Sequence, residues 1–303
     1  QDYAQYHARI NEAEEFIVHN QYEEALKIYE EVFTAYDFVF LNDYQIATQI
    51  ALAAKEEEKC WKYLIAGIKS GWTLKSIKHN TYLEKRRIDP QWKLIKKEYG
   101  LWRNEYETYL NQDARKKVKK MFSKDQWKAI GALFTFGSKG QDRYAEKKFA
   151  PHSEKQIDKL ITILNDWGYP GERLIGNNFW MATILSHHNS ISQAYVQQDT
   201  LYQFVKPSLL NALATGQMSP WEFAMLDGWY RTVKAGWEKA DYGFLNPPTK
   251  EEWMAVNELR KSIGLRSIET RNGLIDIEQS TGMNFYLGGR PWVEGKIEIK
   301  GNK

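Results

Sequence analysis

The segment from residue 174 to 198 (LIGNNFWMATILSHHNSISQAYVQQ) constrains the fold more than any other part of the chain. From Phe179 to Leu185 its side chains are hydrophobic nearly all the way round a helix. Such a helix is buried inside a larger domain, because a helix at a surface keeps one polar face. His187 and His188 then lie at the inner or C-terminal end of a buried helix, where they are the first candidates for a site.

Length and composition indicate a folded protein of two domains. A chain of 303 residues exceeds what one hydrophobic core usually organises. Hydrophobic residues make up 43% of the chain and aromatic residues 14%, which argues against disorder. The formal net charge is only +3, but residues 85–148 contain 18 Lys and Arg against 8 Asp and Glu. The middle of the chain is therefore basic.

The single cysteine, Cys60, excludes an intramolecular disulfide framework and a zinc site built from cysteines. No apolar run approaches the roughly 18 residues of a membrane span, so we expect none. The sequence begins at Gln1 rather than Met, which fits a mature chain after removal of a signal peptide. We therefore expect an exported protein, periplasmic or associated with the cell envelope, with a cytoplasmic protein as the alternative.

Residues 1–110 have the pattern of paired helices in a helical repeat. A turn residue is followed by aromatic, small and apolar residues on one helical face at Asn20, Tyr22, Ala25, Tyr29, Val32 and Phe33. A second unit has Ala51, Ala53 and Ala54 on one helix and Cys60, Leu64, Gly67 and Ile68 on the next. The first set resembles the second half of a tetratricopeptide repeat, with a degenerate period near 38 residues. We expect Asp89-Pro90 to start the last helix of the array and the Trp92 side chain to close the end of the array. The array either offers a groove for a peptide or merely supports the second domain.

Residues 111–150 are expected to form a basic connecting helix and a loop. The basic side chains are Arg115, Lys116, Lys117, Lys119, Lys120, Lys124 and Lys128, and the apolar seam between them consists of Val118, Met121, Phe122 and Trp127. Nucleic acid or anionic lipid could bind such a helix. We favour a solvated helix face, because no nucleic-acid-binding module accompanies it. The loop is placed at residues 137–151.

Residues 151–271 read as a second, compact helical domain. Capping signals predict helix starts at Ser153, at Ser219-Pro220 and at Thr249, and Gly168 and Gly264 are expected to end two of the helices. Pro207 predicts a kink or a break in the amphipathic stretch 201–214. Residues 272–303 contain short Gly-punctuated runs (GLIDIE, NFYLGG, KIEIK), which predict small strands or an extended tail.

Five motifs in the second domain occur in the order found in an uncharacterised bacterial domain family of unknown function. They are Gly168-Tyr169-Pro170, Ser186-His187-His188-Asn189, Leu226-Asp227-Gly228, Tyr242-Gly243-Phe244-Leu245 and the run from Arg260 to Leu265. The chain from about 164 to 268 therefore resembles that family. The family pattern has Gln at position 186, Arg at 228 and Thr-Gln at 244–245, so several polar members are missing here. The resemblance implies candidate positions and no chemistry.

The matched polar residues are His187, Asp227, Tyr242 and Arg260. A His–Asp pair beside a tyrosine could act as a general base in a hydrolase or line a small-ligand pocket. The alternative, which we favour, is a buried hydrogen-bond network that holds helices in register. His187 and His188 point about 100° apart on a helix, so we expect no metal site. No glycine-rich phosphate loop is present, so no nucleotide cofactor is expected.

The sequence thus predicts an all-α protein: a tetratricopeptide-like domain, a basic connector, and a helical domain with a short β-containing tail. We expect a non-enzymatic interaction protein or accessory subunit of a bacterial cell-envelope assembly, which holds a protein or peptide partner. The alternative is a hydrolase-like or small-ligand-binding domain centred on His187 and Asp227, which requires these residues to converge with Tyr242 on an open pocket. Nucleic-acid binding through residues 111–128 is a third possibility and is not favoured.

Overall fold

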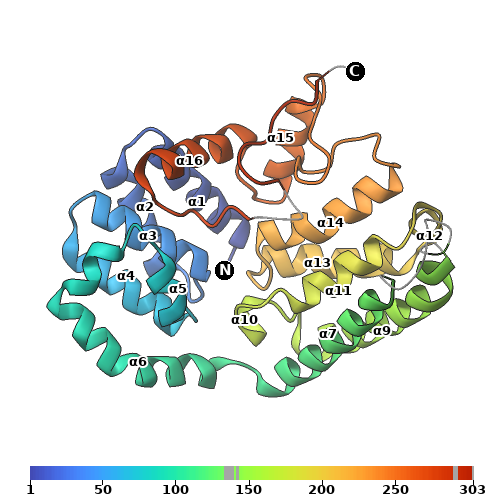
Figure 1. Cartoon of the computed structure of the whole chain (residues 1–303), viewed down its shortest axis with the longest axis horizontal. Helices are drawn as coiled ribbons and strands as arrows, with labels where there is room; N and C mark the ends of the chain where they lie inside the picture. The colour runs from blue at the N-terminus through green and yellow to red at the C-terminus, as the bar shows by residue number, and fades with distance from the viewer. Residues whose placement is uncertain (133–139, 141–142, 289–292, 302–303) are drawn as a thin grey trace. The chain divides into compact units, whose positions relative to one another are not determined.

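The computed structural model describes residues 1–132, 140, 143–288 and 293–301. Within these ranges the chain is all-α and contains no β-strand, which confirms the all-α prediction (Figure 1). The chain forms two compact units. Unit 1 consists of residues 1–110 and 264–296, and unit 2 consists of residues 111–263 and 297–303.

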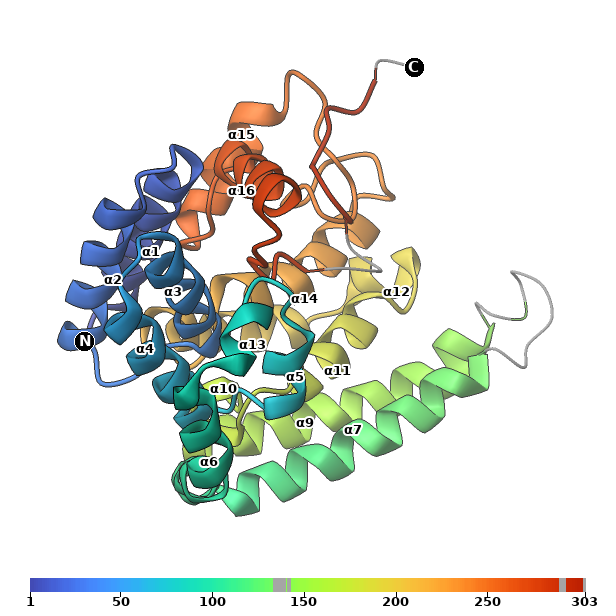
Figure 2. The same cartoon turned by 60° about the vertical axis from the view of Figure 1, so that its left-hand side comes forward.

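Unit 1 is a set of helices in which neighbours along the chain pack against each other. The helices are α1 (Tyr3–Val18), α2 (Tyr22–Ala35), α3 (Leu41–Ala53), α4 (Glu57–Lys69), α5 (Leu74–His79), the 3-10 helix η1 (Glu84–Ile88), α6 (Pro90–Tyr109) and α16 (Ile268–Thr281). Helices α1 and α2 form one pair and α3 and α4 a second, and Figure 2 shows these four side by side. Their assignment to a tetratricopeptide repeat stays a prediction.

Small residues let the helices of these pairs approach closely. A Cβ atom on Gly67 would lie 2.9 Å from the Trp72 ring and 3.6 Å from Cβ of Tyr44, so only glycine fits at this position of α4. Helix α6 begins at Pro90 as predicted, because the Asp89 side chain accepts a hydrogen bond from the backbone N–H of Gln91 at 2.9 Å.

The prediction of strands in the tail is wrong for the run GLIDIE, which lies inside α16. Ser267 caps this helix by accepting a hydrogen bond from the N–H of Thr270, and Gly282 ends it with a left-handed φ of +79°. Leu274 and Ile277 are buried, and α16 packs against α1. A short apolar run between glycines fits a strand or a buried helix equally well, which is why the pattern misled.

Unit 2 contains the other helices of the described residues. They are α7 (Gln112–Ala132), the π-helix η2 (Ala145–Phe149), α9 (Ala150–Trp167), α10 (Glu172–Ile175), α11 (Trp180–Asn189), α12 (Gln193–Gln198), α13 (Leu201–Ala214), α14 (Pro220–Lys234) and α15 (Trp253–Ser262). Helix α11 packs against α7, α9 and α14, and its residues Met181, Ala182, Ile184 and Leu185 are fully buried. The expected buried helix is therefore confirmed.

The structure tests four of the predicted helix signals. Helix α9 begins at Ala150, so Ser153 lies inside the helix and not at its cap. Helix α13 continues through Pro207 as one helix, so the break into two short helices is not formed. The predicted cap at Ser219 is present, since its hydroxyl accepts a hydrogen bond from the N–H of Glu222. Helix α15 begins at Trp253, later than predicted, and the Thr249 hydroxyl accepts from the N–H of Glu252 in the turn before it.

The predicted domain boundaries differ from the two units at the second domain and the tail. Helix α7 is not a connector, because it packs against α9 and α11 as part of unit 2. Residues 264–296 belong to unit 1, although 264–271 were assigned to the second domain. The predicted loop at residues 137–151 lies partly outside the described residues, and its described end is helical from 143 onwards.

The predicted apolar seam of α7 is correct except at one position. Val118 and Met121 are buried, whereas Trp127 is 76% exposed. Among the described helices, none combines the length and the apolar character that crossing a membrane requires.

Candidate functional site

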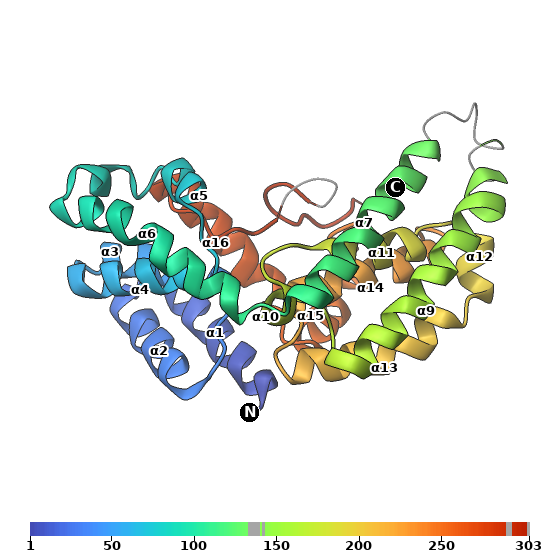
Figure 3. The ribbon, with the colours of Figure 1, turned by 90° about the horizontal axis from the view of Figure 1, so that it is seen from below.

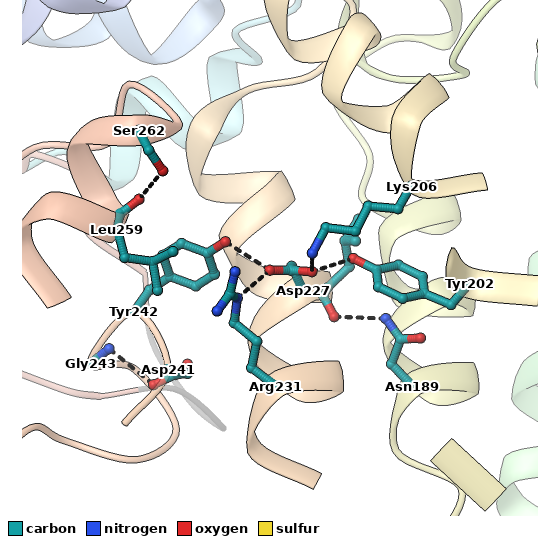
Figure 4. Close-up of polar contacts among 11 residues, drawn as sticks. Asn189, Tyr202, Lys206, Asp227, Arg231, Asp241, Tyr242, Gly243, Leu259 and Ser262 are labelled. Atoms are coloured by element: carbon teal, nitrogen blue, oxygen red, sulfur yellow. Dashed lines mark hydrogen bonds and ion pairs between the residues drawn. The ribbon is translucent and has the colours of Figure 1, made fainter. Parts of the chain in front are cut away.

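Asp227 of α14 is the centre of a buried polar cluster that joins three parts of unit 2 (Figure 4). Its Oδ1 accepts hydrogen bonds from the Tyr202 hydroxyl at 2.7 Å and from Lys206 Nζ at 2.6 Å, both on α13. Its Oδ2 accepts from Arg231 Nε at 2.6 Å and from the Tyr242 hydroxyl at 2.8 Å. The carboxylate therefore ties α13 and the turn at Tyr242 to α14.

The charges around Asp227 keep it ionised. Burial raises the pKa of a carboxyl group, but the Lys206 and Arg231 cations and the hydrogen bonds outweigh burial and hold the pKa of Asp227 below its ordinary value. A carboxylate with a lowered pKa and four donors is a poor proton acceptor near neutral pH. Its geometry fits a structural centre, with Lys206 and Arg231 reaching solvent at 26% and 38% side-chain exposure.

Tyr242 and Arg260 belong to the same region but do not line an open pocket. Tyr242 is 1% exposed and Arg260 is fully buried. Nη1 of Arg260 donates to the backbone carbonyl of Tyr242 at 2.6 Å, so α15 holds the turn that carries Tyr242. The preceding residue, Asp241, accepts backbone hydrogen bonds from Gly243, Phe244, Leu245 and Asn246.

Gly228 of α14 lies directly against the Asp241 side chain. A Cβ atom at Gly228 would lie 2.7 Å from Oδ2 of Asp241, so the space beside α14 is already filled by the Asp241 carboxylate.

His187 does not join the Asp227 cluster. Its Nδ1 lies 2.6 Å from Oδ2 of Asp125 on α7, and the histidine side chain is 31% exposed while the carboxylate is fully buried. The predicted His187–Asp227 pair is therefore not formed, and the three residues of the hydrolase-like alternative do not converge. The sequence could have indicated that Asp125 is buried, because it follows Met121 by four residues and so lies on the same, apolar face of the basic helix.

A serine, a histidine and an aspartate lie in a row next to His187, and this arrangement was not predicted from the sequence. Oγ of Ser153 lies 2.9 Å from Nδ1 of His188, and Nε2 of His188 lies 3.3 Å from Oδ2 of Asp199. Ser153 and His188 are fully buried, and Asp199 is 8% exposed. A nucleophile must be open to its substrate, so this string acts as a structural link between α9, α11 and the start of α13. It was missed because Ser153 was expected to cap a helix.

The Gly168-Tyr169-Pro170 turn is fastened to α14 by a buried carboxyl group. The Tyr169 hydroxyl donates to Oε1 of Glu222 at 2.8 Å, and both side chains are buried. Burial raises the pKa of Glu222 to about 7, despite the hydrogen bonds from Tyr169 and from the backbone of Ser219. The protonation of Glu222 should therefore change within the accessible pH range.

Replacement of Glu222 by Gln should remove a pH dependence of the free energy of unfolding. A folded-state pKa of about 7, against an ordinary 4.5, corresponds to about 3 kcal/mol. Because the folded pKa is raised, this contribution is complete below pH 4.5 and is lost as the pH rises to about 7. Urea unfolding between pH 4.5 and 8 should show intact protein losing stability relative to Glu222→Gln. The exposed Glu251→Gln should show no such difference, and equal slopes for Glu222→Gln and intact protein would contradict the assignment.

Unit 1 holds an extended segment of the chain, residues 283–287, by its backbone. The Gln49 side chain of α3 donates to the carbonyl of Asn284 and accepts from its N–H, both at 2.8 Å. Glu278 of α16 accepts from the N–H of Phe285 at 2.6 Å. Side chains thus take the place of a neighbouring strand, which is why this run is extended without being a β-strand.

The side chains of this segment alternate between core and solvent. Met283, Phe285 and Leu287 are buried in the same hydrophobic cluster as residues of α1 to α4. Asn284 is exposed and Tyr286 is half-buried, with the Tyr286 hydroxyl accepting from Nδ2 of Asn80 at 3.2 Å. Tyr286 has a left-handed φ of +54°, which costs a non-glycine residue about 1 kcal/mol.

In the described part of the chain, no group of three His, Cys, Asp or Glu side chains is placed to hold a metal ion. No family model matches the chain, and neither a curated protein nor a solved structure shows significant similarity to it. The resemblance to a bacterial domain family and to tetratricopeptide repeats therefore stays a prediction.

Proposed function

We propose that the chain is a non-enzymatic interaction protein whose unit 1 holds an extended segment of a partner protein. The place of binding is the surface on which residues 283–287 now lie. The observation that carries the proposal is the pair of hydrogen bonds between the Gln49 amide and the backbone of Asn284. The sequence alone suggests that this partner belongs to a bacterial cell envelope.

Backbone recognition of this kind does not depend on which side chains the bound segment carries. Gln49 supplies one donor and one acceptor, and a peptide group of any sequence offers the matching pair. Specificity then comes from the alternate side chains, as in other complexes in which an extended peptide is held by its main chain. The chain's own segment defines the pattern: apolar residues at the first, third and fifth positions.

The fourth position of the pattern favours glycine in a partner. Tyr286 adopts its left-handed conformation at a cost, whereas glycine adopts it freely. A segment with glycine at that position should therefore compete with the chain's own residues. The segment Met-Asn-Phe-Gly-Leu-Gly combines the observed apolar positions with this glycine and serves as the probe.

Binding of a fluorescein-labelled Met-Asn-Phe-Gly-Leu-Gly peptide, followed by fluorescence anisotropy, tests the proposal. The variant Phe285→Ala/Leu287→Ala loosens the chain's own segment, so it should bind the peptide at least about tenfold more tightly than the intact chain. Adding Gln49→Ala should weaken binding by about tenfold, the value of one or two hydrogen bonds. Gln91→Ala, at an exposed position of α6, is the matched control and should leave binding unchanged.

Hydrogen exchange in the intact chain provides a second measurement that does not depend on the double variant folding. Saturating peptide should speed amide exchange at residues 283–287, because these residues are displaced. Binding that is unaffected by Gln49→Ala, or no binding to either chain and no change in exchange, would show that the segment only seals unit 1.

A further inference from the structure

Helices α7 and α9 of unit 2 lie side by side (Figure 3). Their side chains form a groove of about 370 Å³. Lys117, Lys120 and Lys124 of α7 line it on one side, and Lys159 of α9 lines it on the other. Met121 and Ile163 form its floor and are buried. The groove thus combines cationic rims with an apolar floor.

Helical spacing places these side chains together. Positions 117, 120, 121 and 124 are separated by three or four residues, so they share one face of α7. The four lysines are exposed, and none of them forms an ion pair with a carboxylate in the described part of the chain. The ammonium group of Lys117 lies 4.2 Å from the centre of the Trp167 ring, which also belongs to α9.

Four like charges around one groove repel one another. Two of them act on His152 of α9: burial lowers the pKa of His152, Asp125 opposes this effect, and Lys159 and Lys124 of the groove, together with the neighbouring Lys128, lower the pKa further. Walls of low dielectric constant concentrate such a field and attract anions into a cleft. Neutralisation by a bound anion should therefore stabilise the folded chain.

The rim favours phosphate over carboxylate. Lysine binds phosphate as a point charge, and four ammonium groups around one groove match a multiply charged phosphate better than a carboxylate, which carries a single charge. The volume lies within the range of roughly 300–1,000 Å³ that is typical of small-molecule sites.

We propose that the groove between α7 and α9 binds a small organic phosphate, with two or more phosphate groups on the lysines and an apolar body on Met121 and Ile163. The site lies in unit 2 and is independent of the proposed peptide site in unit 1. The shared phosphate chemistry could also come from the headgroups of a membrane. The free organic phosphate is favoured because the apolar floor is recessed beneath the lysine rim.

Thermal unfolding and calorimetric titration of the full chain at constant ionic strength test the proposal, with adenosine triphosphate and inorganic triphosphate as probes. Both should raise the unfolding temperature, and adenosine triphosphate should bind more tightly because its base covers the apolar floor. Replacing Lys117, Lys120, Lys124 and Lys159 by Gln should weaken binding more than about 100-fold, since each charged hydrogen bond contributes about tenfold or more. Without ligand, this variant should unfold at an equal or higher temperature than the intact chain.

Two further variants separate the groove from net charge. Replacement of Lys27, Lys78, Lys93 and Lys96, which are exposed lysines of unit 1, by Gln should leave binding unchanged. Replacement of the four groove lysines by Arg should retain binding. The proposal would be overturned if the Gln variant of the groove bound the probes as tightly as the intact chain does. It would also be overturned if adenosine triphosphate and inorganic triphosphate bound with equal affinity. Binding to vesicles of anionic phospholipid, with phosphatidylcholine vesicles as blank, would overturn it as well when neither soluble probe binds.

Discussion

A fragment that ends at residue 110 should not fold as a stable helical domain, although the sequence pattern marks that residue as a domain end. Unit 1 also needs Leu274, Ile275 and Ile277 of α16, and the buried Phe285 and Leu287. Burial of such side chains contributes about 1.5–3 kcal/mol each, so these five supply about 8–15 kcal/mol. That equals the whole stability of a typical domain, about 5–15 kcal/mol.

A buried charge makes the loss more severe. Glu14 of α1 is fully buried and accepts two hydrogen bonds from the Arg266 guanidinium, both at 2.6 Å. The fragment would keep the Glu14 carboxylate and lose the two hydrogen bonds from Arg266. Circular dichroism of fragment 1–110 should show no cooperative thermal transition. Residues 1–110 joined to 264–296 by a flexible linker of about 20 residues should recover one, whereas a cooperative transition in the short fragment would contradict the division into units.

Replacement of Asp227 by Asn should lower the free energy of unfolding by about 3 kcal/mol, because it leaves Lys206 and Arg231 without their shared carboxylate. The cations reach solvent, which keeps the loss at the lower end of the range for buried pairs. Since the pKa of Asp227 is lowered, its contribution is present above its ordinary pKa and is lost only as the pH falls below it. Urea unfolding at neutral pH measures the effect.

A double-mutant cycle separates this explanation from a simple loss of packing. Lys206→Met should cost less in the Asp227→Asn background than in the intact chain, because one unpaired charge is then removed. Asp158→Asn, at an exposed position of α9, should stay within about 0.5 kcal/mol of the intact chain. Additive effects of the two changes at positions 206 and 227 would mean that the residues are not coupled.

Helix ends were readable from the sequence because their signals are local. Asp89-Pro90, Ser219-Pro220 and Gly168 act on the backbone within a turn of themselves, and the structure has helix ends at each. Ser153 shows the limit of such reasoning. Its hydroxyl reaches His188, 35 residues away, and only packing of α9 against α11 brings the two together.

The partners of the candidate residues could not be read from the sequence for the same reason. His187 was paired with Asp227 because both matched one motif family, yet it meets Asp125, 62 residues earlier in the chain. Lys206, which neutralises Asp227, directly precedes Pro207. The proline predicted a kink or break in this helix, and the charge of Lys206 was not recognised as a partner for Asp227. Which side chains meet depends on the packing of α7, α11, α13 and α14, and local periodicity carries no information about that.

The division of unit 1 between residues 1–110 and 264–296 sets the order in which a ribosome can complete the protein. The nascent helices α1 to α6 emerge before unit 2 but lack α16 until residues 111–263 have been translated. Most of unit 2, residues 111–263, is synthesised without interruption and is available for folding earlier. The apolar faces of α1 to α6 therefore stay uncovered until α16 is synthesised, more than 150 residues later.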